Sequence, residues 1–361
     1  MSTKTRYFVI VSLLVLGVGM GTGLVAYYVG FPAGAFASRG GPADLGFVPR
    51  DASVIAFANV NEIMASELRQ KLRRAIPMPE NGQQELESQT GINLETDIDT
   101  VVACLSPEAG GTGKPGAGMV LARGRFDETK IEALMRDHGA HVETYNGKRL
   151  IVADPNDRRR DNAVNDPDPD PDPNLHPNLH PRTTSFSLSF MEPGLAAIGS
   201  TTLIKSAIDL HKAGNNPQTG LESVTGNEEL MTLVRSLDNS NAWAVGRFDA
   251  LRTQSHLPAS VLSQIPAITW FAVSAHVNGG LRGTLRAEAR DDESANNLRD
   301  VVRGFLALAK LGSGARPELQ AMMQSLELGG TGKTVSLSFA VPAELFDVIG
   351  AAANRGKPAM H

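Results

Sequence analysis

The chain has almost no cysteine and few aromatic residues, and each shortage excludes a class of site. Cys104 is the only cysteine among 361 residues, so neither an intrachain disulfide nor a cysteine-based zinc site is possible. Cys104 lies in the apolar run VVACL, which predicts a buried, inert thiol rather than a nucleophile. Aromatic residues make up 5% of the chain, so the core must be built mainly from Ala, Val, Leu and Ile.

Excess positive charge is also missing. The formal net charge is −5, which argues against nucleic-acid binding, because that function needs clustered Lys and Arg. No G-x-S-x-G, S-x-x-K or H-E-x-x-H motif occurs. The sequence therefore shows no recognisable catalytic residues for a serine hydrolase or a zinc protease. We therefore predict no catalytic, cofactor-binding or metal-binding residue.

Two glycine-rich strings resemble nucleotide-binding loops but lack an essential residue. GGTGK occurs at 110–114 and GGTGKT at 329–334. A P-loop needs a first glycine five residues before its Gly-Lys pair, and Glu108 and Glu327 occupy that position. Both strings are therefore interpreted as hairpin turns.

A polar insertion, DPDPDPDPNLHPNLHP at 166–181, is the most unusual local feature. Alternating Asp-Pro favours extended backbone and supplies no apolar side chain to bury, so we predict a disordered loop over about 155–183. The other reading is weak cation capture, but the glycine turn of a calcium loop is missing. That capture would use the carboxylates Asp166, Asp168, Asp170 and Asp172, or His176 and His180.

The remaining histidines and the two tryptophans have structural interpretations. His138 and His141 lack the spacing of a zinc motif. His211 is expected near the last carbonyl groups of a helix, and His276 at a strand end. Trp243 and Trp270 lie in apolar strand runs, which favours core packing over ligand stacking.

The longest uncharged run, residues 7–31, predicts a membrane anchor. Tyr7 to Gly30 would form a helix about 36 Å long, enough for a hydrocarbon core of about 30 Å. Lys4 and Arg6 precede the run, and the next charge is Arg39. This asymmetry favours a cytoplasmic N-terminus and an exported C-terminal domain.

Two questions about the anchor stay open. Ala35-Phe36-Ala37 resembles a signal-peptidase site, although the apolar run is longer than a typical signal peptide needs. Gly17 and Gly21 have the G-x-x-x-G spacing that lets membrane helices approach closely, so the anchor could dimerise. Glycine is also simply common in membrane helices.

The composition and the spacing of turn residues predict an α+β fold. We expect an N-terminal transmembrane helix followed by two related units of mostly antiparallel sheet, each with helices on one face. Asn146-Gly147 and Asn278-Gly279 predict hairpin turns. The expected divisions are an anchor at 1–31, a flexible linker at 32–46, a first unit at 47–215, a second unit at 216–355 and a disordered tail at 356–361.

Recurring strings suggest that the two units are duplicates. GRFD occurs at 124–127 and 246–249, and SLSF at 187–190 and 336–339. A looser match relates VIAFANVNEI at 54–63 to AWAVGRFDAL at 242–251.

The opening VPRDASVIAFANVNEI at 48–63 and the phrase TGINLETDID at 90–99, together with the anchor, resemble uncharacterised bacterial membrane-anchored proteins with a duplicated α+β domain. That resemblance implies a single-pass protein of the bacterial inner membrane with its C-terminal domain outside the cytoplasm. It implies no activity and supplies no site residue.

The most hydrophobic stretch outside the anchor is 298–326. It includes Val301, Phe305 and Leu308, followed by Met322 and Met323. One interpretation is a core helix of the second unit; the other is a partner-binding or dimer face. An exposed apolar face on this stretch would favour the second interpretation.

The function best supported by these observations is a non-catalytic, membrane-anchored binding or scaffold protein. The alternatives are a hydrolase with an acidic site, which needs carboxylates converging in a cleft, and a carrier of a small ligand or lipid, which needs an enclosed apolar cavity.

Overall fold

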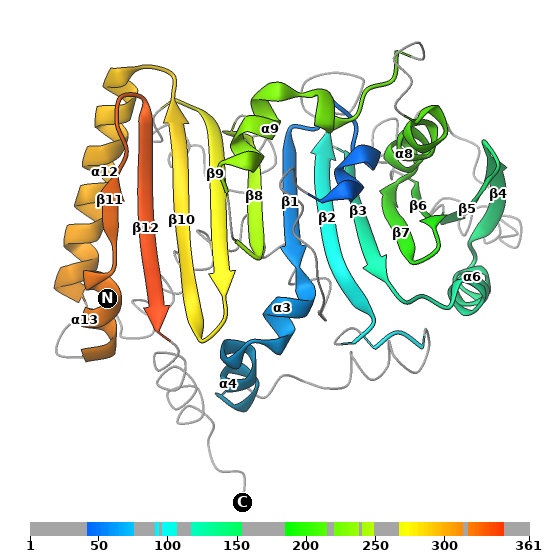
Figure 1. Ribbon diagram of the computed structural model, residues 1–361, viewed down its shortest axis with the longest axis horizontal. Coiled ribbons are helices and arrows are strands. Elements are labelled where there is room, and N and C mark those ends of the chain that lie inside the picture. Colours follow the sequence, from blue (N-terminus) through cyan, green and yellow to red (C-terminus); the bar gives the residue numbers. More distant parts are fainter. Residues whose placement is uncertain are drawn as a thin grey trace, which may run out of the picture.

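The fold is α+β, and its centre is one antiparallel sheet of twelve strands (Figure 1). The computed structural model describes residues 42–75, 91–93, 96–106, 117–153, 185–214, 220–237, 240–248, 267–312 and 317–342. The order across the sheet is β11-β12-β10-β9-β8-β1-β2-β3-β7-β6-β5-β4. The strands are β1 (Val54–Asn59), β2 (Ile98–Ser106), β3 (Ala117–Gly124), β4 (His141–Tyr145), β5 (Lys148–Ala153), β6 (Phe186–Glu192), β7 (Leu195–Ser200), β8 (Ala242–Arg247), β9 (Ile268–Val277), β10 (Gly280–Ala289), β11 (Glu327–Gly329) and β12 (Thr334–Pro342).

The described helices lie between these strands in the sequence. They are the 3₁₀-helices η2 (Ala43–Phe47) and η4 (Val224–Gly226) and the α-helices α3 (Val60–Ala65), α4 (Glu67–Ala75), α6 (Glu128–Asp137), α8 (Thr201–Ala213), α9 (Glu228–Arg235), α12 (Asp292–Gly312) and α13 (Pro317–Gln324). No described helix is long and apolar enough to cross a membrane. The predicted anchor at 1–31, including Gly17 and Gly21, lies outside the described residues, as do the tail and the Asp-Pro loop.

Polar capping residues begin most of the helices, as local sequence predicts. The side chain of Asp127 accepts a hydrogen bond from the Lys130 amide at the start of α6, and Asn227 caps α9 in the same way through Leu230. Such caps satisfy amides that have no partner inside the helix. The predicted Asn146-Gly147 hairpin is confirmed: both residues have positive φ and join β4 to β5.

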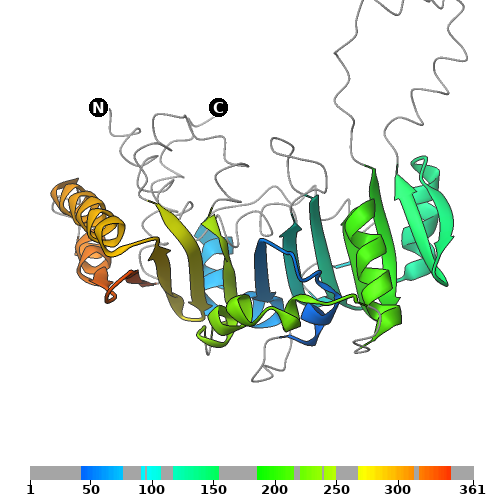
Figure 2. The ribbon, with the colours of Figure 1, turned by 90° about the horizontal axis from the view of Figure 1, so that it is seen from above.

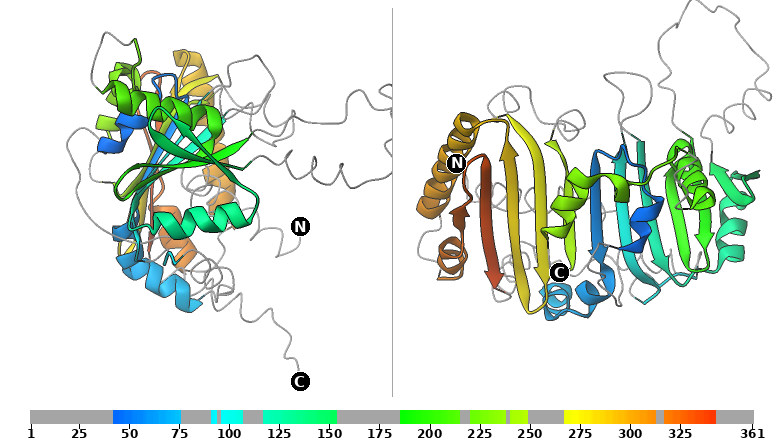
Figure 3. Two further views of the ribbon diagram at one scale, coloured as in Figure 1. Left: turned by 90° about the vertical axis from the view of Figure 1, so that its right-hand side faces the viewer. Right: turned by 45° about the horizontal axis from the view of Figure 1, so that its top comes forward.

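The two segments expected to form separate units share the same sheet. β1 pairs with β8, and Ala56 faces Ala244 at the centre of that pairing. Strands therefore follow one another without interruption from β11 and β12 at one end to β4 at the other (Figure 3).

Helices cover both faces of the sheet, in contrast to the single covered face that we expected. Ile55 of β1 belongs to a large buried cluster under η2, α8 and α9, whereas Ala58 belongs to a second cluster with α3, α4 and α13. Residues three apart on a strand point to opposite faces, so the two clusters lie on opposite sides (Figure 2).

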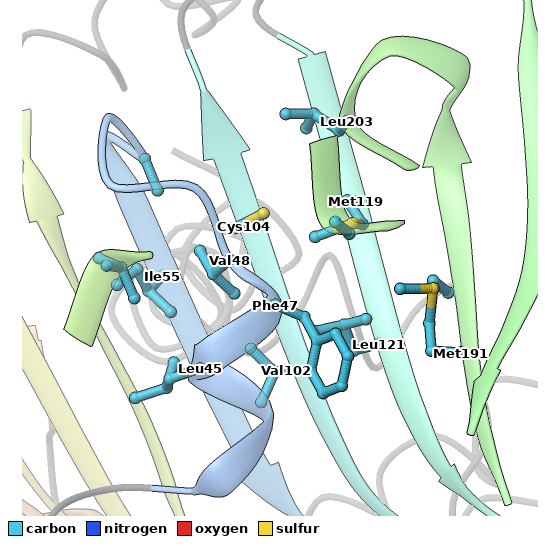
Figure 4. Close-up of a cluster of buried hydrophobic side chains, with 14 of the residues drawn as sticks. Leu45, Phe47, Val48, Ile55, Val102, Cys104, Met119, Leu121, Met191 and Leu203 are labelled. Atoms are coloured by element: carbon cyan, nitrogen blue, oxygen red, sulfur yellow. The ribbon is translucent and has the colours of Figure 1, made fainter. Parts of the chain in front are cut away.

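The linker predicted for 32–46 ends earlier than expected. Residues 43–46 belong to η2, and the side chain of Leu45 is fully buried in the large cluster beside Phe47 and Val48 (Figure 4). Glycine and proline around this short helix concealed its packing role in the sequence.

Candidate docking surface

Helix α12 lies at the end of the sheet formed by β11 and β12 (Figures 1 and 2). Asp291, the residue immediately before α12, accepts a 2.7 Å hydrogen bond from the Ser294 amide. The hydrogen bond of the Ser294 side chain, followed by that of its amide, lowers the pKa of the Asp291 carboxyl. Ala295 is buried against Ala289 and Val335, and Leu298 packs on the same group, so the first half of the helix is held firmly on the sheet.

The second half of α12 presents large apolar side chains to solvent. Val301 is 40% exposed, Phe305 56% and Leu308 67%. These are three of the five large hydrophobic side chains that are exposed among the described residues. We call Val301, Gly304, Phe305 and Leu308 the α12 stripe, because their spacing of i, i+3, i+4 and i+7 places them on one side of a helix.

The apolar character of this half exceeds what packing on the sheet requires. Val302 and Leu306 are half-buried on the core side. At 100° per residue, Leu308 and Leu306 bound an apolar arc of about 160°, whereas a helix on a core needs an apolar stripe of at least about 100°. The solvent-facing part of this arc carries Val301, Phe305 and Leu308, which nothing in the described part of the chain covers, and Gly304 lies just beyond its edge.

Gly304 lies at one edge of the stripe, about 100° around the helix from Phe305, and no contact within the described part of the chain explains it. A Cβ atom built on Gly304 would meet no described atom within 4 Å. Glycine in a helix interior costs about 0.5–1 kcal/mol relative to alanine. Sequence reasoning missed Gly304, although an isolated glycine within an apolar helical pattern was a usable signal.

The rest of the predicted 298–326 region does not belong to this surface. Met322 and Met323 of α13 are 4% and 8% exposed and pack with Phe339 and Val341 of β12. They were candidates for adaptable partner contacts, but their burial makes them core residues, so the candidate surface is confined to α12.

An open pocket lies on the other face of the sheet from α12, between η2, α8 and η4. This open pocket has a volume of about 340 Å³ and includes Phe47, Leu210, His211 and Leu221 in its lining. The His211 ring stacks on Phe47 with centroids 5.3 Å apart, and its Nδ1 lies 3.9 Å from Glu192. His211 lies in the last turn of α8, near the final carbonyl groups as expected, and its ring also stacks on Phe47.

Asp44 and Arg123 form an ion pair that ties η2 to β3. The Arg123 guanidinium donates two hydrogen bonds to the buried Asp44 carboxylate and lies 3.6 Å from Glu192. The hydrogen bond to Asp44 raises the pKa of Arg123 above its ordinary value. The pair has a structural role, because it satisfies a charge that the packing of η2 buries.

The other residues considered from sequence are scattered. Cys104 is buried, and burial raises the pKa of its thiol to about 12, which confirms the inert-thiol prediction. Trp243 is buried beside Phe57, which confirms core packing, and Trp270 is partly buried. The second glycine-rich string forms the turn between β11 and β12, as predicted.

The polar candidates that the structure describes do not converge. The imidazole of His138 lies 2.8 Å from the Leu134 carbonyl oxygen, His141 begins the edge strand β4, and His276 is exposed on β9. Within the described ranges, no group of three His, Cys, Asp or Glu side chains is placed to hold a metal ion. Several other candidates lie outside these ranges: the first glycine-rich string at 110–114, Asp166, Asp168, Asp170, Asp172, His176 and His180.

Comparison with known proteins adds no relative. No protein-family model matches the chain, and neither a curated protein nor a solved structure shows significant similarity to it.

Proposed function

We propose that this chain is a non-catalytic, membrane-anchored binding protein of the bacterial envelope and that it docks its partner on the α12 stripe. The supporting observation is the exposure of Val301, Phe305 and Leu308 on a helix that is otherwise held against the sheet. Exposed apolar side chains gathered on one element mark interaction sites more often than scattered ones do.

The proposal includes the arrangement in the membrane. Residues 7–30 span the inner membrane once, the N-terminus is cytoplasmic, and the sheet domain lies outside the cytoplasm. Only 31–41 separate this span from the first described residue, Pro42. Eleven extended residues reach about 40 Å at most, so the domain works close to the bilayer surface.

We further propose that the sheet domain consists of two related units. Topology supports this: β1-β2-β3-β7-β6 and β8-β9-β10-β12-β11 follow the same order outward from the β1–β8 pair. A two-fold axis near Ala56 and Ala244 would relate them. The looser match, between 54–63 and 242–251, falls on the equivalent strands β1 and β8. The identical strings GRFD and SLSF fall on non-equivalent strands.

The test compares two single substitutions in the full-length chain. Phe305→Asp places a charge in the stripe, and Phe186→Asp places one at a similarly exposed phenylalanine on the other half of the sheet. Chemical cross-linking in native membranes should yield a discrete complex for the wild type and for Phe186→Asp. The complex should be lost for Phe305→Asp.

A further control separates the anchor from the domain. Replacing residues 1–40 with an unrelated anchor should keep both the membrane association and the complex. A complex that is insensitive to Phe305→Asp, or no complex at all from folded protein, would refute docking on the α12 stripe.

The pocket beside Phe47 and His211 favours a second candidate function, binding of a small aromatic or apolar ligand. It opens to solvent instead of enclosing a cavity, so it suits a lipid carrier less well. Saturable quenching of Trp fluorescence by a ligand, lost on His211→Ala, would support this candidate.

A further inference from the structure

We infer that Asn278 is a site of spontaneous deamidation, whereas the same Asn-Gly dipeptide at Asn146 is protected by the fold. This modification does not depend on the proposed docking function. The two described Asn-Gly pairs, 146–147 and 278–279, both lie in exposed hairpin turns. They share their dipeptide chemistry and their access to water, so they differ mainly in what holds each asparagine side chain. A third pair, at 81–82, lies outside the described residues.

Deamidation of an Asn-Gly pair requires the asparagine side chain to reach the next backbone nitrogen. The glycine nitrogen attacks the side-chain carbonyl carbon, a new carbon–nitrogen bond forms, and the side-chain nitrogen leaves as ammonia with the proton of the attacking amide. Water then opens the five-membered imide at either of its carbonyl carbons, which gives aspartate or isoaspartate. Glycine favours the attack, because it has no Cβ to hinder the approach and its backbone rotates freely.

The Asn146 side chain is held at both ends by helix α8. Its Nδ2 donates a 2.6 Å hydrogen bond to the Asp209 carboxylate, and its Oδ1 accepts a 3.1 Å hydrogen bond from Lys212. Asp209 also accepts a 3.0 Å hydrogen bond from the Tyr145 hydroxyl. Turning the Asn146 amide toward the Gly147 nitrogen would break both of its hydrogen bonds. The turn also holds Asn146 in the left-handed conformation, in which Cβ points away from the next backbone nitrogen.

The Asn278 side chain has no such restraint. It is exposed, and no described residue forms a hydrogen bond with its amide group. Neither Asn278 nor Gly279 adopts the left-handed conformation. The Asn278 amide can therefore rotate toward the Gly279 nitrogen without breaking a hydrogen bond.

Isoaspartate at position 278 would disturb the start of α4. The main-chain carbonyl oxygen of Asn278 accepts a 2.9 Å hydrogen bond from the Leu68 amide, in the first turn of α4 beside the β9–β10 turn (Figure 1). An amide in a first helical turn has no partner inside the helix. In isoaspartate this carbonyl becomes a free carboxylate and the main chain gains one methylene group. The acceptor is displaced, and we expect α4 to loosen at its first turn.

Peptide mapping by mass spectrometry tests the difference between the two turns. Full-length protein in detergent is incubated at mildly alkaline pH, and the aspartate and isoaspartate products at 146 and 278 are separated and followed with time. In the folded protein, Asn278 should deamidate severalfold faster than Asn146. In urea the two rates should become similar, because the fold no longer holds either side chain.

Substitutions on α8 test the protection of Asn146. Asp209→Ala removes the acceptor of the Asn146 amide, so it should raise the rate at Asn146 severalfold and leave the rate at Asn278 unchanged. Lys212→Ala removes the other hydrogen bond and should act in the same direction, which keeps the test available if Asp209→Ala does not fold.

Gly279→Ala is the matched control at the reactive turn. It should lower the rate at Asn278 severalfold, because the added methyl group hinders the attack. The fold tolerates this substitution, since the added Cβ would meet only the Glu67 carboxylate, at an ordinary contact distance of 3.5 Å. Incubation should speed amide hydrogen exchange at Leu68 in the wild type but not in Gly279→Ala, because exchange reports local opening.

Three results would overturn the inference. Equal rates at Asn146 and Asn278 in the folded protein would show that the fold does not discriminate between the turns. An Asn278 that deamidates in urea but stays intact in the folded protein would show that this turn is protected too. Unchanged rates at Asn146 in both folded α8 variants would show that Asp209 and Lys212 do not provide its protection.

Discussion

At the scale of single residues, Asp44 shows how a buried charge fixes a short element. It is the one charged side chain that is buried within the described ranges, and its partner Arg123 is 36% exposed. The carboxylate therefore exchanges water for hydrogen bonds from a guanidinium that keeps part of its own hydration. Removing one partner of such a pair leaves the other unsatisfied.

Asp44→Ala should lower the free energy of unfolding by about 1–3 kcal/mol, because η2 loses its tie to β3 and Arg123 loses its acceptor. Urea denaturation of the purified protein measures this. Glu222→Ala is the matched control: Glu222 also pairs with an arginine, Arg50, but both side chains are half exposed, so the loss should stay below about 1 kcal/mol. Equal losses would contradict the role given to Asp44.

The burial of Cys104 predicts how the free energy of unfolding depends on pH. Its folded pKa, about 12, lies above the ordinary 9.0, so burial favours the protonated thiol. The contribution of this group to stability is complete below about pH 9 and is lost as the pH rises toward 12. The free energy of unfolding of the wild type should therefore fall more steeply over this range than that of Cys104→Ala. Parallel pH profiles would show that the thiol is not buried as described.

At the scale of elements, local signals in the sequence were sufficient for most strands and helices. The run ITWFAVSAHV corresponds to β9, residues 268–277, and Pro317, a residue type that suits a first helical turn, begins α13. What sequence could not supply was the environment of each element. Leu45 is core because η2 folds back onto β1 and β2, and Met322 is buried because α13 packs on β12. Both depend on contacts between residues distant in sequence.

Only part of the candidate surface could be predicted from the sequence, because the rest depends on contacts between distant residues. The apolar excess of 298–310 could be counted in the sequence, but which side faces solvent depends on where β10 and β12 place the helix. Gly304 was overlooked because a lone glycine in a helix has many possible causes. Within the described part of the chain, a Cβ atom at this position meets nothing within 4 Å, which no pattern in the sequence indicates.

Gly304→Ala tests whether position 304 is open within the described part of the chain. In detergent solution the substitution should raise the free energy of unfolding of the full-length protein in urea by about 0.5–1 kcal/mol. Alanine is the better helix former, and a Cβ atom at this position meets no described atom within 4 Å. A loss of stability in detergent would mean that Gly304 contacts its own chain.

At the scale of the whole molecule, the β1–β8 pair decides whether the two halves behave as domains. Five residue pairs join these strands, two of them alanine with alanine, and the large buried cluster continues across them from Ile55 and Val102 to Trp243 and Val245. Unfolding either half would expose the apolar surface of the other. The sheet therefore links the halves more tightly than a surface contact between independent domains would.

This continuity predicts a single cooperative unfolding transition, and the chain carries a natural probe on each side. Trp243 and Trp270 report on the second half through fluorescence, and Cys104 reports on the first through its reaction with a thiol reagent once exposed. In urea, the midpoints of the two signals should coincide, because coincident probes are the mark of two-state unfolding. If fluorescence changes at a lower urea concentration than thiol exposure, the second half melts alone, and the β1–β8 pair joins two separately stable domains.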